Sequence, residues 1–182
     1  MNPRLRAAFL AIALLSCGAY PLIGQAAKPL QVGDMAPDYV GRDGQGKAVH
    51  LSDYRGKVVV LSFWATWCGP CLKELPVLEK VQRAAAPHGL QVLAVNWKEE
   101  SRLFRKIRST LAEYQLTLVS DESGRAGASY GVTAIPHMLL VGKDGRITFI
   151  NIGYGESVLD KVVDEINKAL AANFAAEPPA TH

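Results

Sequence analysis

Two cysteines lie three positions apart in the middle of the chain, within Trp67-Cys68-Gly69-Pro70-Cys71. Residues at this spacing share one face of a helix, so both thiols can react together if the first one begins a helix. Unpaired N–H groups and the dipole at a helix N-terminus stabilise a thiolate there. The pair therefore predicts thiol–disulfide chemistry; a structural disulfide and half of a zinc site are the alternatives.

The segments around this pentapeptide have the patterns that such chemistry requires. An apolar, β-branched run over residues 58–64 precedes it and predicts a buried strand. Apolar residues at 71, 72, 75, 78 and 81 follow and predict a helix. Pro70 falls in its first turn, where a missing N–H costs little, and Gly69 leaves room for a partner's backbone. We expect a partly exposed Cys68 to attack as thiolate and Cys71 to resolve the mixed disulfide.

The rest of the chain alternates between strand and helix patterns. A hairpin is predicted over 40–51, strands at 90–97, 116–119, 138–141 and 146–150, and helices at 99–113, 123–130 and 156–174. In the helix over 99–113, Leu103, Ile107 and Leu111, together with Phe104, are expected to face inward. This order predicts an α/β fold with a central mixed sheet flanked by helices.

Composition limits the function classes. The 182 residues suit one compact domain plus a targeting segment. The net charge is +3, and two of the positive residues, Arg4 and Arg6, lie in the N-terminal leader. The remainder is near neutral, which excludes nucleic acid as a partner. A bridge between two thiols so close in sequence closes almost no loop, so it gains little stability, which disfavours a structural role.

The first 26 residues have the pattern of an export signal, with a positive start, an apolar stretch over 7–15 and small residues before a predicted cleavage after Ala26. Leu14-Leu15-Ser16-Cys17 is similar to a lipoprotein signal, in which a lipidated Cys17 would anchor the protein to a membrane. An uncleaved leader is a third possibility. All three export a domain over 27–174, followed by a disordered tail over 175–182, to a disulfide-tolerant compartment such as the periplasm.

Several segments together resemble one family. Residues 63–71, with 33–38, 51–57, 130–136 and 144–147, are similar to the TlpA/ResA-like group of exported bacterial thiol–disulfide oxidoreductases in the thioredoxin superfamily. The resemblance implies a thioredoxin-like fold with an N-terminal β-hairpin extension. We expect a monomer that needs no cofactor and no metal.

The resemblance also assigns roles near the dithiol. It implies a cis peptide at Ile135–Pro136, with backbone groups of Ile135 pairing with a substrate peptide. Trp67 would offer a contact surface for that partner. Glu74 matches an active-site glutamate that tunes the thiols and takes a proton from Cys71. The alternative for Glu74 is an exposed helix residue.

Other positions keep two interpretations. Glu99 matches a second acidic position, but it also suits a helix start for dipole reasons alone. His137 stands where the group usually has Thr, and is either a pH-sensitive contact near the thiols or a packed histidine. Ser62 stands where thioredoxin itself carries a buried Asp. A basic helix face is either solvated or a docking surface for an acidic partner, and comprises Arg102, Arg105, Lys106 and Arg108.

The predicted function is reduction of disulfides in partner proteins. The Gly-Pro dipeptide is that of thioredoxin, a reducing couple at about −270 mV. The family implies a membrane thiol reductase as electron donor, and apocytochrome c or respiratory copper-site cysteines as acceptors. A thiol-dependent peroxidase is one alternative, although the pattern Pro-x-x-x-Thr-x-x-Cys is missing around Cys68. A copper carrier using Cys68, Cys71 and His137 is the other.

Overall fold

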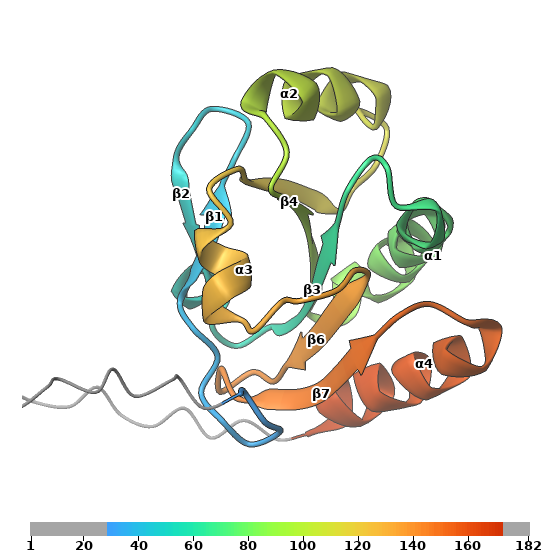
Figure 1. Cartoon of the computed structure of the whole chain (residues 1–182). Helices are drawn as coiled ribbons and strands as arrows, with labels where there is room; N and C mark the ends of the chain where they lie inside the picture. The colour runs from blue at the N-terminus through green and yellow to red at the C-terminus, as the bar shows by residue number, and fades with distance from the viewer. Residues whose placement is uncertain (1–28, 173–182) are drawn as a thin grey trace, which may run out of the picture.

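Seven strands form one mixed sheet in the computed structural model, which describes residues 29–172 (Figure 1). The spatial order is β2-β1-β5-β4-β3-β6-β7, with β3, β4 and β5 parallel and the other neighbours antiparallel. The strands are β1 (Tyr39–Arg42), β2 (Ala48–His50), β3 (Val58–Trp64), β4 (Leu90–Trp97), β5 (Thr117–Asp121), β6 (His137–Val141) and β7 (Ile147–Ile152). This confirms the predicted mixed sheet and the N-terminal hairpin, β1–β2.

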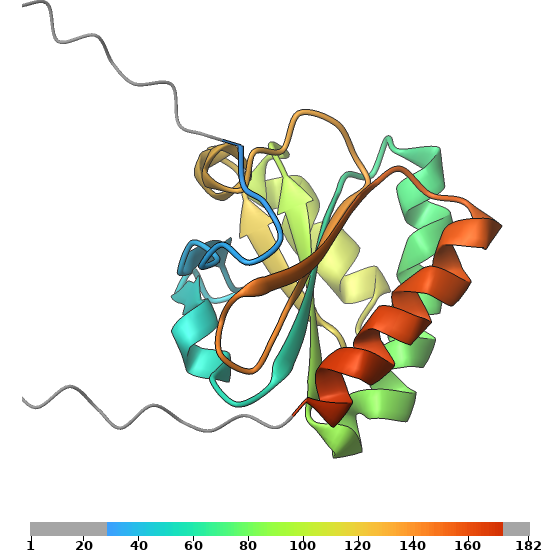
Figure 2. The same ribbon diagram turned by 90° about the horizontal axis from the view of Figure 1, so that it is seen from below.

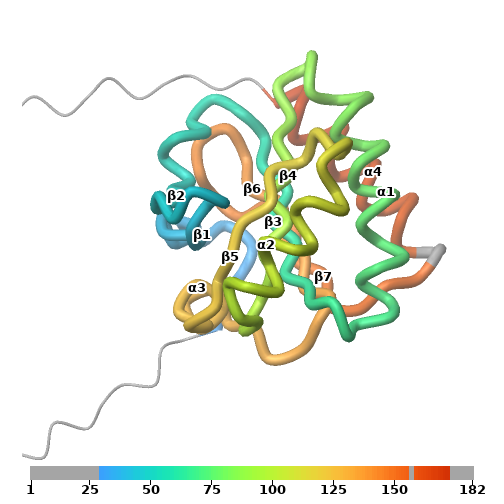
Figure 3. The backbone as a smooth tube through the Cα atoms, turned by 90° about the horizontal axis from the view of Figure 1, so that it is seen from above, coloured from blue at the N-terminus to red at the C-terminus, as the bar shows by residue number. Residues whose placement is uncertain are grey.

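Helices cover both faces of this sheet. They are α1 (Gly69–Ala85), α2 (Ser101–Thr110), α3 (Arg125–Ser129) and α4 (Glu156–Ala171), with short 3-10 turns η1 (Leu51–Tyr54) and η2 (Ala86–His88). α1 and α4 lie against one face and α3 lies on the other (Figure 2). Seen from above, β1 and β2 lie on the opposite side of the molecule from α1 and α4 (Figure 3).

Strand β3 is the centre of the core, and all seven of its residues are buried. Val58 and Val60 pack on the face that carries α1, whereas Val59, Leu61 and Phe63 pack on the opposite face. A strand buried on both faces has a continuous apolar sequence rather than an alternating one, which explains the run before the cysteines. The position of the dithiol is thus fixed by a strand paired on both sides.

Helix α2 is shorter than predicted, and of the residues expected to face inward Phe104 is buried whereas Leu103 is not. It spans Ser101–Thr110 rather than 99–113. Phe104 is buried, whereas Leu103 is 37% exposed, so the expectation for Leu103 was wrong. Phe104 shares a helix face with Ile107, three residues on, and Ile107 packs against the core cluster on the α1 face, whereas Leu103 lies outside that face.

The expected leader over 1–26, with Cys17, and the tail over 175–182 lie outside the described residues. Among the residues that are described, no helix combines the length and apolar character needed to cross a bilayer. The lead-in to β1 pairs with the β6–β7 hairpin through a bridge between Met35 and Arg146.

Candidate active site

The two cysteines form a disulfide at the junction of β3 and α1. Their sulfur atoms are 2.03 Å apart. Cys68 is the N-cap of α1, and its sulfur accepts the backbone N–H of Cys71 at 3.2 Å. This geometry provides the N–H donor and the positive helix end that stabilise a thiolate. Cys68 is only 5% exposed, so the prediction of partial exposure was wrong; its side chain joins the core cluster on the α1 face.

The surface around the disulfide is exposed and largely apolar. Trp67 is 69% exposed, and Gly69 and Pro70 are exposed beside it. A side chain built at Gly69 would meet nothing within 4 Å, so the backbone there is open to a partner. The Ile135–Pro136 peptide is cis, as predicted, and Ile135 packs against the core cluster that contains both cysteines.

Glu74 lies inside the protein, one helical turn after Cys71. It is 2% exposed, which rules out the alternative of an exposed helix residue. The hydroxyl of Ser62 on β3 donates to its carboxylate at 2.6 Å. Burial raises the pKa of Glu74 to about 7, and the hydrogen bond from Ser62 partly offsets that rise. The structure therefore holds a carboxyl group that titrates near neutral pH on the same helix face as Cys71.

Glu99 is buried in the loop between β4 and α2 and binds the loop before Cys68. Its carboxylate accepts the N–H of Thr66 at 2.8 Å and the hydroxyl of Thr66 at 2.6 Å. It also accepts the side-chain amide of Asn96 at 2.6 Å. Lys98 has a positive φ of 56°, which turns the chain back before Glu99. Neither Thr66 nor Asn96 was predicted from the sequence, because their contacts depend on how the two loops meet.

His137 begins β6, directly after Pro136, and is 4% exposed. It is paired with Phe63, so it points to the face opposite α1, and the two rings lie 6.4 Å apart. Burial lowers the pKa of this imidazole. The packing favours the interpretation as a packed histidine. Within residues 29–172, no three His, Cys, Asp or Glu side chains gather as metal ligands, so the geometry gives no support to a carrier site of Cys68, Cys71 and His137.

A second cluster, missed from the sequence, supports the loop that carries Pro136. Asp121 is buried at the end of β5 and accepts the N–H groups of Ala126 and Gly127 at 3.0 and 2.8 Å. Burial raises the pKa of Asp121. The indole of Trp97 packs so closely on α3 that a Cβ at Gly127 would lie 2.3 Å from its nitrogen. These contacts hold α3, which leads into the Pro136 loop.

A disulfide just after the central strand, together with a cis proline whose preceding residue packs on the cluster of both cysteines, defines a dithiol protein of the thioredoxin fold. Comparison with known proteins supports the same class. The model of the AhpC/TSA family matches residues 32–150. Thiol-disulfide oxidoreductase ResA of Bacillus thuringiensis subsp. konkukian is 31% identical over 143 residues, which cover 75% of this chain and 81% of the relative.

Solved structures show the same similarity. The crystal structure of a DsbE-type thiol:disulfide interchange protein from Chlorobium tepidum superposes with a TM-score of 0.70 at 32% identity, covering 78% of this chain and 99% of that one. The exposed lipoprotein thioredoxin Etrx1 of Streptococcus pneumoniae gives 0.63 at 29% identity, covering 72% and 99%. The chain belongs to the AhpC/TSA family, among its ResA-like thiol–disulfide oxidoreductases, which confirms the resemblance seen in the sequence.

Proposed function

We propose that this oxidoreductase works in the periplasm as a reductant of disulfides in partner proteins. The observation that carries the proposal is the combination of a dithiol at the start of α1 with a buried carboxyl group of near-neutral pKa one turn later. The first group exchanges disulfides, and the second handles the proton that this exchange releases.

The reaction begins on the reduced protein. The Cys68 thiolate attacks one sulfur of the substrate disulfide, so that a bond forms between Cys68 and the substrate while the substrate's own S–S bond breaks. One substrate sulfur leaves as a thiolate. The N–H of Cys71 at the helix start lowers the cost of the attacking thiolate.

The second step resolves the mixed disulfide. Cys71 gives its proton to the ionised carboxylate of Glu74, and its thiolate attacks the sulfur of Cys68. The second substrate sulfur leaves, two electrons have passed to the substrate, and the protein ends with the Cys68–Cys71 disulfide. Burial of Glu74 suits this step, because a carboxylate of raised pKa is a stronger base.

Substrate binding involves the exposed surface beside the disulfide. Trp67, Gly69 and Pro70 offer an open contact area, and the backbone of Ile135 next to Pro136 pairs with an extended substrate peptide. Glu99 fixes the loop that carries Trp67. In this proposal Glu99 is a positioning residue rather than one that touches the reacting sulfurs.

The proposal also covers where the protein works and which protein supplies its electrons. The leader pattern over 1–26 and the exposed-lipoprotein neighbour support export, with either cleavage after Ala26 or lipidation of Cys17. A membrane thiol reductase returns electrons to the monomeric protein. Acceptors are cysteines of apocytochrome c or of respiratory copper-site factors.

Trapping partners with Cys71→Ser tests the function. This variant cannot resolve the mixed disulfide, so we expect covalent adducts that dithiothreitol releases and whose protein partners are identified by mass spectrometry. The matched control, Cys68→Ser, lacks the attacking thiol and should trap none. A reduction potential of about −120 mV for the Cys68–Cys71 disulfide would instead indicate that the protein is an oxidant. Peroxide turnover by the wild-type protein in the absence of such adducts would favour the peroxidase alternative.

A further inference from the structure

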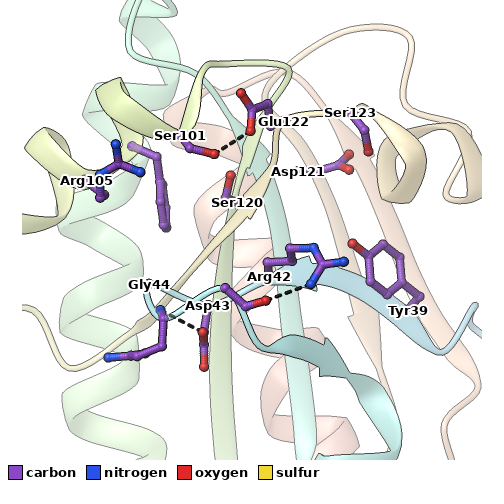
Figure 4. Close-up of a pocket in the computed structure, with 13 residues that line it drawn as sticks. Tyr39, Arg42, Asp43, Gly44, Ser101, Arg105, Ser120, Asp121, Glu122 and Ser123 are labelled. Atoms are coloured by element: carbon purple, nitrogen blue, oxygen red, sulfur yellow. Dashed lines mark hydrogen bonds between the residues drawn. The ribbon is translucent and has the colours of Figure 1, made fainter.

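The ends of β4 and β5 support helix α3 on the face of the sheet opposite the two cysteines. Trp97 is the last residue of β4, and it pairs in register with Asp121, the last residue of β5. Partners in a parallel pair point to the same face of the sheet, so both side chains face α3. Figure 4 shows the carboxylate of Asp121 directed toward this helix.

Helix α3 is too short to hold its own position. It has five residues, Arg125–Ser129, and a helix of that length is unstable without contacts from outside. Asp121 supplies two of them, since its carboxylate accepts the N–H groups of Ala126 and Gly127 at 3.0 and 2.8 Å. Trp97 supplies a third, because a Cβ built at Gly127 would lie 2.3 Å from the indole nitrogen and 2.6 Å from the adjacent ring carbon. The indole therefore lies directly against the backbone of Gly127.

This close approach explains the glycine in the middle of α3. Glycine lowers helix propensity, and Gly127 has a helical backbone rather than the left-handed conformation that favours glycine. Alanine would suit the helix better, but its Cβ would collide with Trp97. The indole N–H is buried and has no acceptor among residues 29–172, so no hydrogen bond holds the ring there. The contact is one of shape, which makes it sensitive to a single added methyl group.

Gly127 also connects the indole to the loop that ends at Pro136. The carbonyl of Gly127 accepts the N–H of Val132 at 2.8 Å. Val132 is buried in the core cluster on the α3 face, so this part of the loop is held on two sides. Ile135, whose backbone pairs with the substrate in the proposed function, follows in the same loop. A shift of α3 at Gly127 therefore moves the chain that leads to Ile135.

We propose that Trp97 is a positioning residue, which acts through Gly127 to place the Ile135 backbone for pairing with an extended substrate peptide. This rests on the proposed function, in which that backbone binds the substrate. The indole packs on the face of the sheet opposite the cysteines and does not touch the reacting sulfurs. Displacing α3 should therefore weaken peptide binding and leave the attack of Cys68 on a bound disulfide unaltered.

Reduction of a peptide disulfide by the reduced full-length protein tests the proposal. The probe is the peptide Val-Thr-Cys-Thr-Val with blocked ends, whose cysteine is bonded to a chromophoric aryl thiol. Cys68 attacks the peptide sulfur, the aryl thiolate leaves and is followed by its absorbance, and Cys71 then releases the peptide as a thiol. Single-turnover rates against peptide concentration give the half-saturating concentration and the maximal rate. The symmetric aryl disulfide has no peptide backbone to pair and is the comparison substrate.

Gly127→Ala should raise the half-saturating peptide concentration about tenfold, as expected for one lost backbone hydrogen bond, with a maximal rate within about twofold of wild type. Trp97→Val removes the support of α3 and should have a similar effect. The double variant should bind no more weakly than Trp97→Val, because the added Cβ then has room. Rates with the aryl disulfide should stay unchanged. Ala128→Gly, an exposed change in α3 that lowers only helix propensity, should weaken peptide binding less than about twofold.

Four results would overturn the positioning role. They are unchanged peptide binding in Gly127→Ala and Trp97→Val, a fall in the maximal rate alone, additive losses in the double variant, or an equal loss in Ala128→Gly. Circular dichroism checks that each variant is folded, and Trp97→Val decides the question where Gly127→Ala is not. Wild-type protein that reduces neither substrate refutes the proposed function, whereas wild-type kinetics in both single variants refute the positioning role alone.

Discussion

Two buried glutamates belong to the segments around the disulfide, Glu74 on α1 after Cys71 and Glu99 bound to the loop before Cys68, and they differ in their hydrogen-bond partners. Glu99, in the loop after β4, accepts three hydrogen bonds from Thr66 and Asn96. Glu74, on α1, accepts one, from Ser62. Burial raises the pKa of Glu74, so this group can take up or release a proton near neutral pH, whereas the three donors on Glu99 tie that side chain to the loop before Cys68. Glu99 therefore anchors the loop before Cys68, whereas Glu74 is a group that can exchange a proton.

Removing the anchor should have the largest effect. Glu99→Ala leaves the N–H and hydroxyl of Thr66 and the amide of Asn96 without their acceptor. We expect the free energy of unfolding to fall by about 4 kcal/mol, because three hydrogen bonds are lost, their buried donors are left unpaired and a cavity remains. Urea denaturation measures this loss. The neighbouring Glu100→Ala changes an exposed side chain and should shift the midpoint little; an equal shift in both variants would remove Glu99 from the anchoring role.

Removing the poorly solvated carboxyl should have the opposite effect on stability. The folded pKa of Glu74 is about 7 against an ordinary 4.5, so the folded protein favours the protonated form. Stability therefore falls as pH rises from about 4.5 to about 7 and then levels off. Glu74→Gln should abolish that fall and be more stable than wild type at pH 8 by about 3 kcal/mol, measured on the oxidised protein.

The same variant should lose activity. Without a proton acceptor for Cys71, we expect disulfide reduction at pH 8 to slow by about 100-fold. Glu113→Gln, an exposed glutamate after α2, is the matched control for both measurements. A Glu74→Gln protein with wild-type turnover and an unchanged pH profile would contradict the role of Glu74 as base.

A smaller effect should follow from removing the single partner of Glu74. The hydroxyl of Ser62 lowers the pKa of Glu74, so Ser62→Ala should raise that pKa by about one unit. The rate of disulfide reduction rises as Glu74 ionises, and the rising limb of its pH profile should move to higher pH by the same amount. Ser62→Thr keeps a hydroxyl and should restore the wild-type profile. A lower rate with an unmoved profile would indicate a packing defect only.

The comparison also shows which parts of the site could be predicted from the sequence. The dithiol, its helix and its strand have local patterns, since the periodicity of residues 58–81 and the spacing of the cysteines lie in one continuous segment. Family resemblance placed the cis peptide at Pro136 and drew attention to Glu74 and Glu99. It could not distinguish the two glutamates, because their difference lies in partners such as Thr66 and Ser62, which depend on tertiary contacts.

Errors in the prediction have the same origin. The exposure of Cys68 was overestimated, because an N-cap position says nothing about the core cluster that covers the sulfur. Leu103 was expected to face inward because it shares a four-residue spacing with Ile107 and Leu111. In the structure the helix is rotated so that Phe104 is buried and Leu103 is partly exposed. For His137, only the register of β6 against β3 assigns the side chain to one face of the sheet.

The complete burial of β3 has a consequence for how the protein moves. A strand with hydrogen-bonded neighbours on both sides and no exposed residue separates from them only when most of the domain unfolds. Cys71 follows this strand closely and is itself fully buried. We therefore expect slow amide exchange in β3 and no inexpensive local fluctuation that uncovers the resolving thiol, so that a partner reaches it through the sulfur of Cys68.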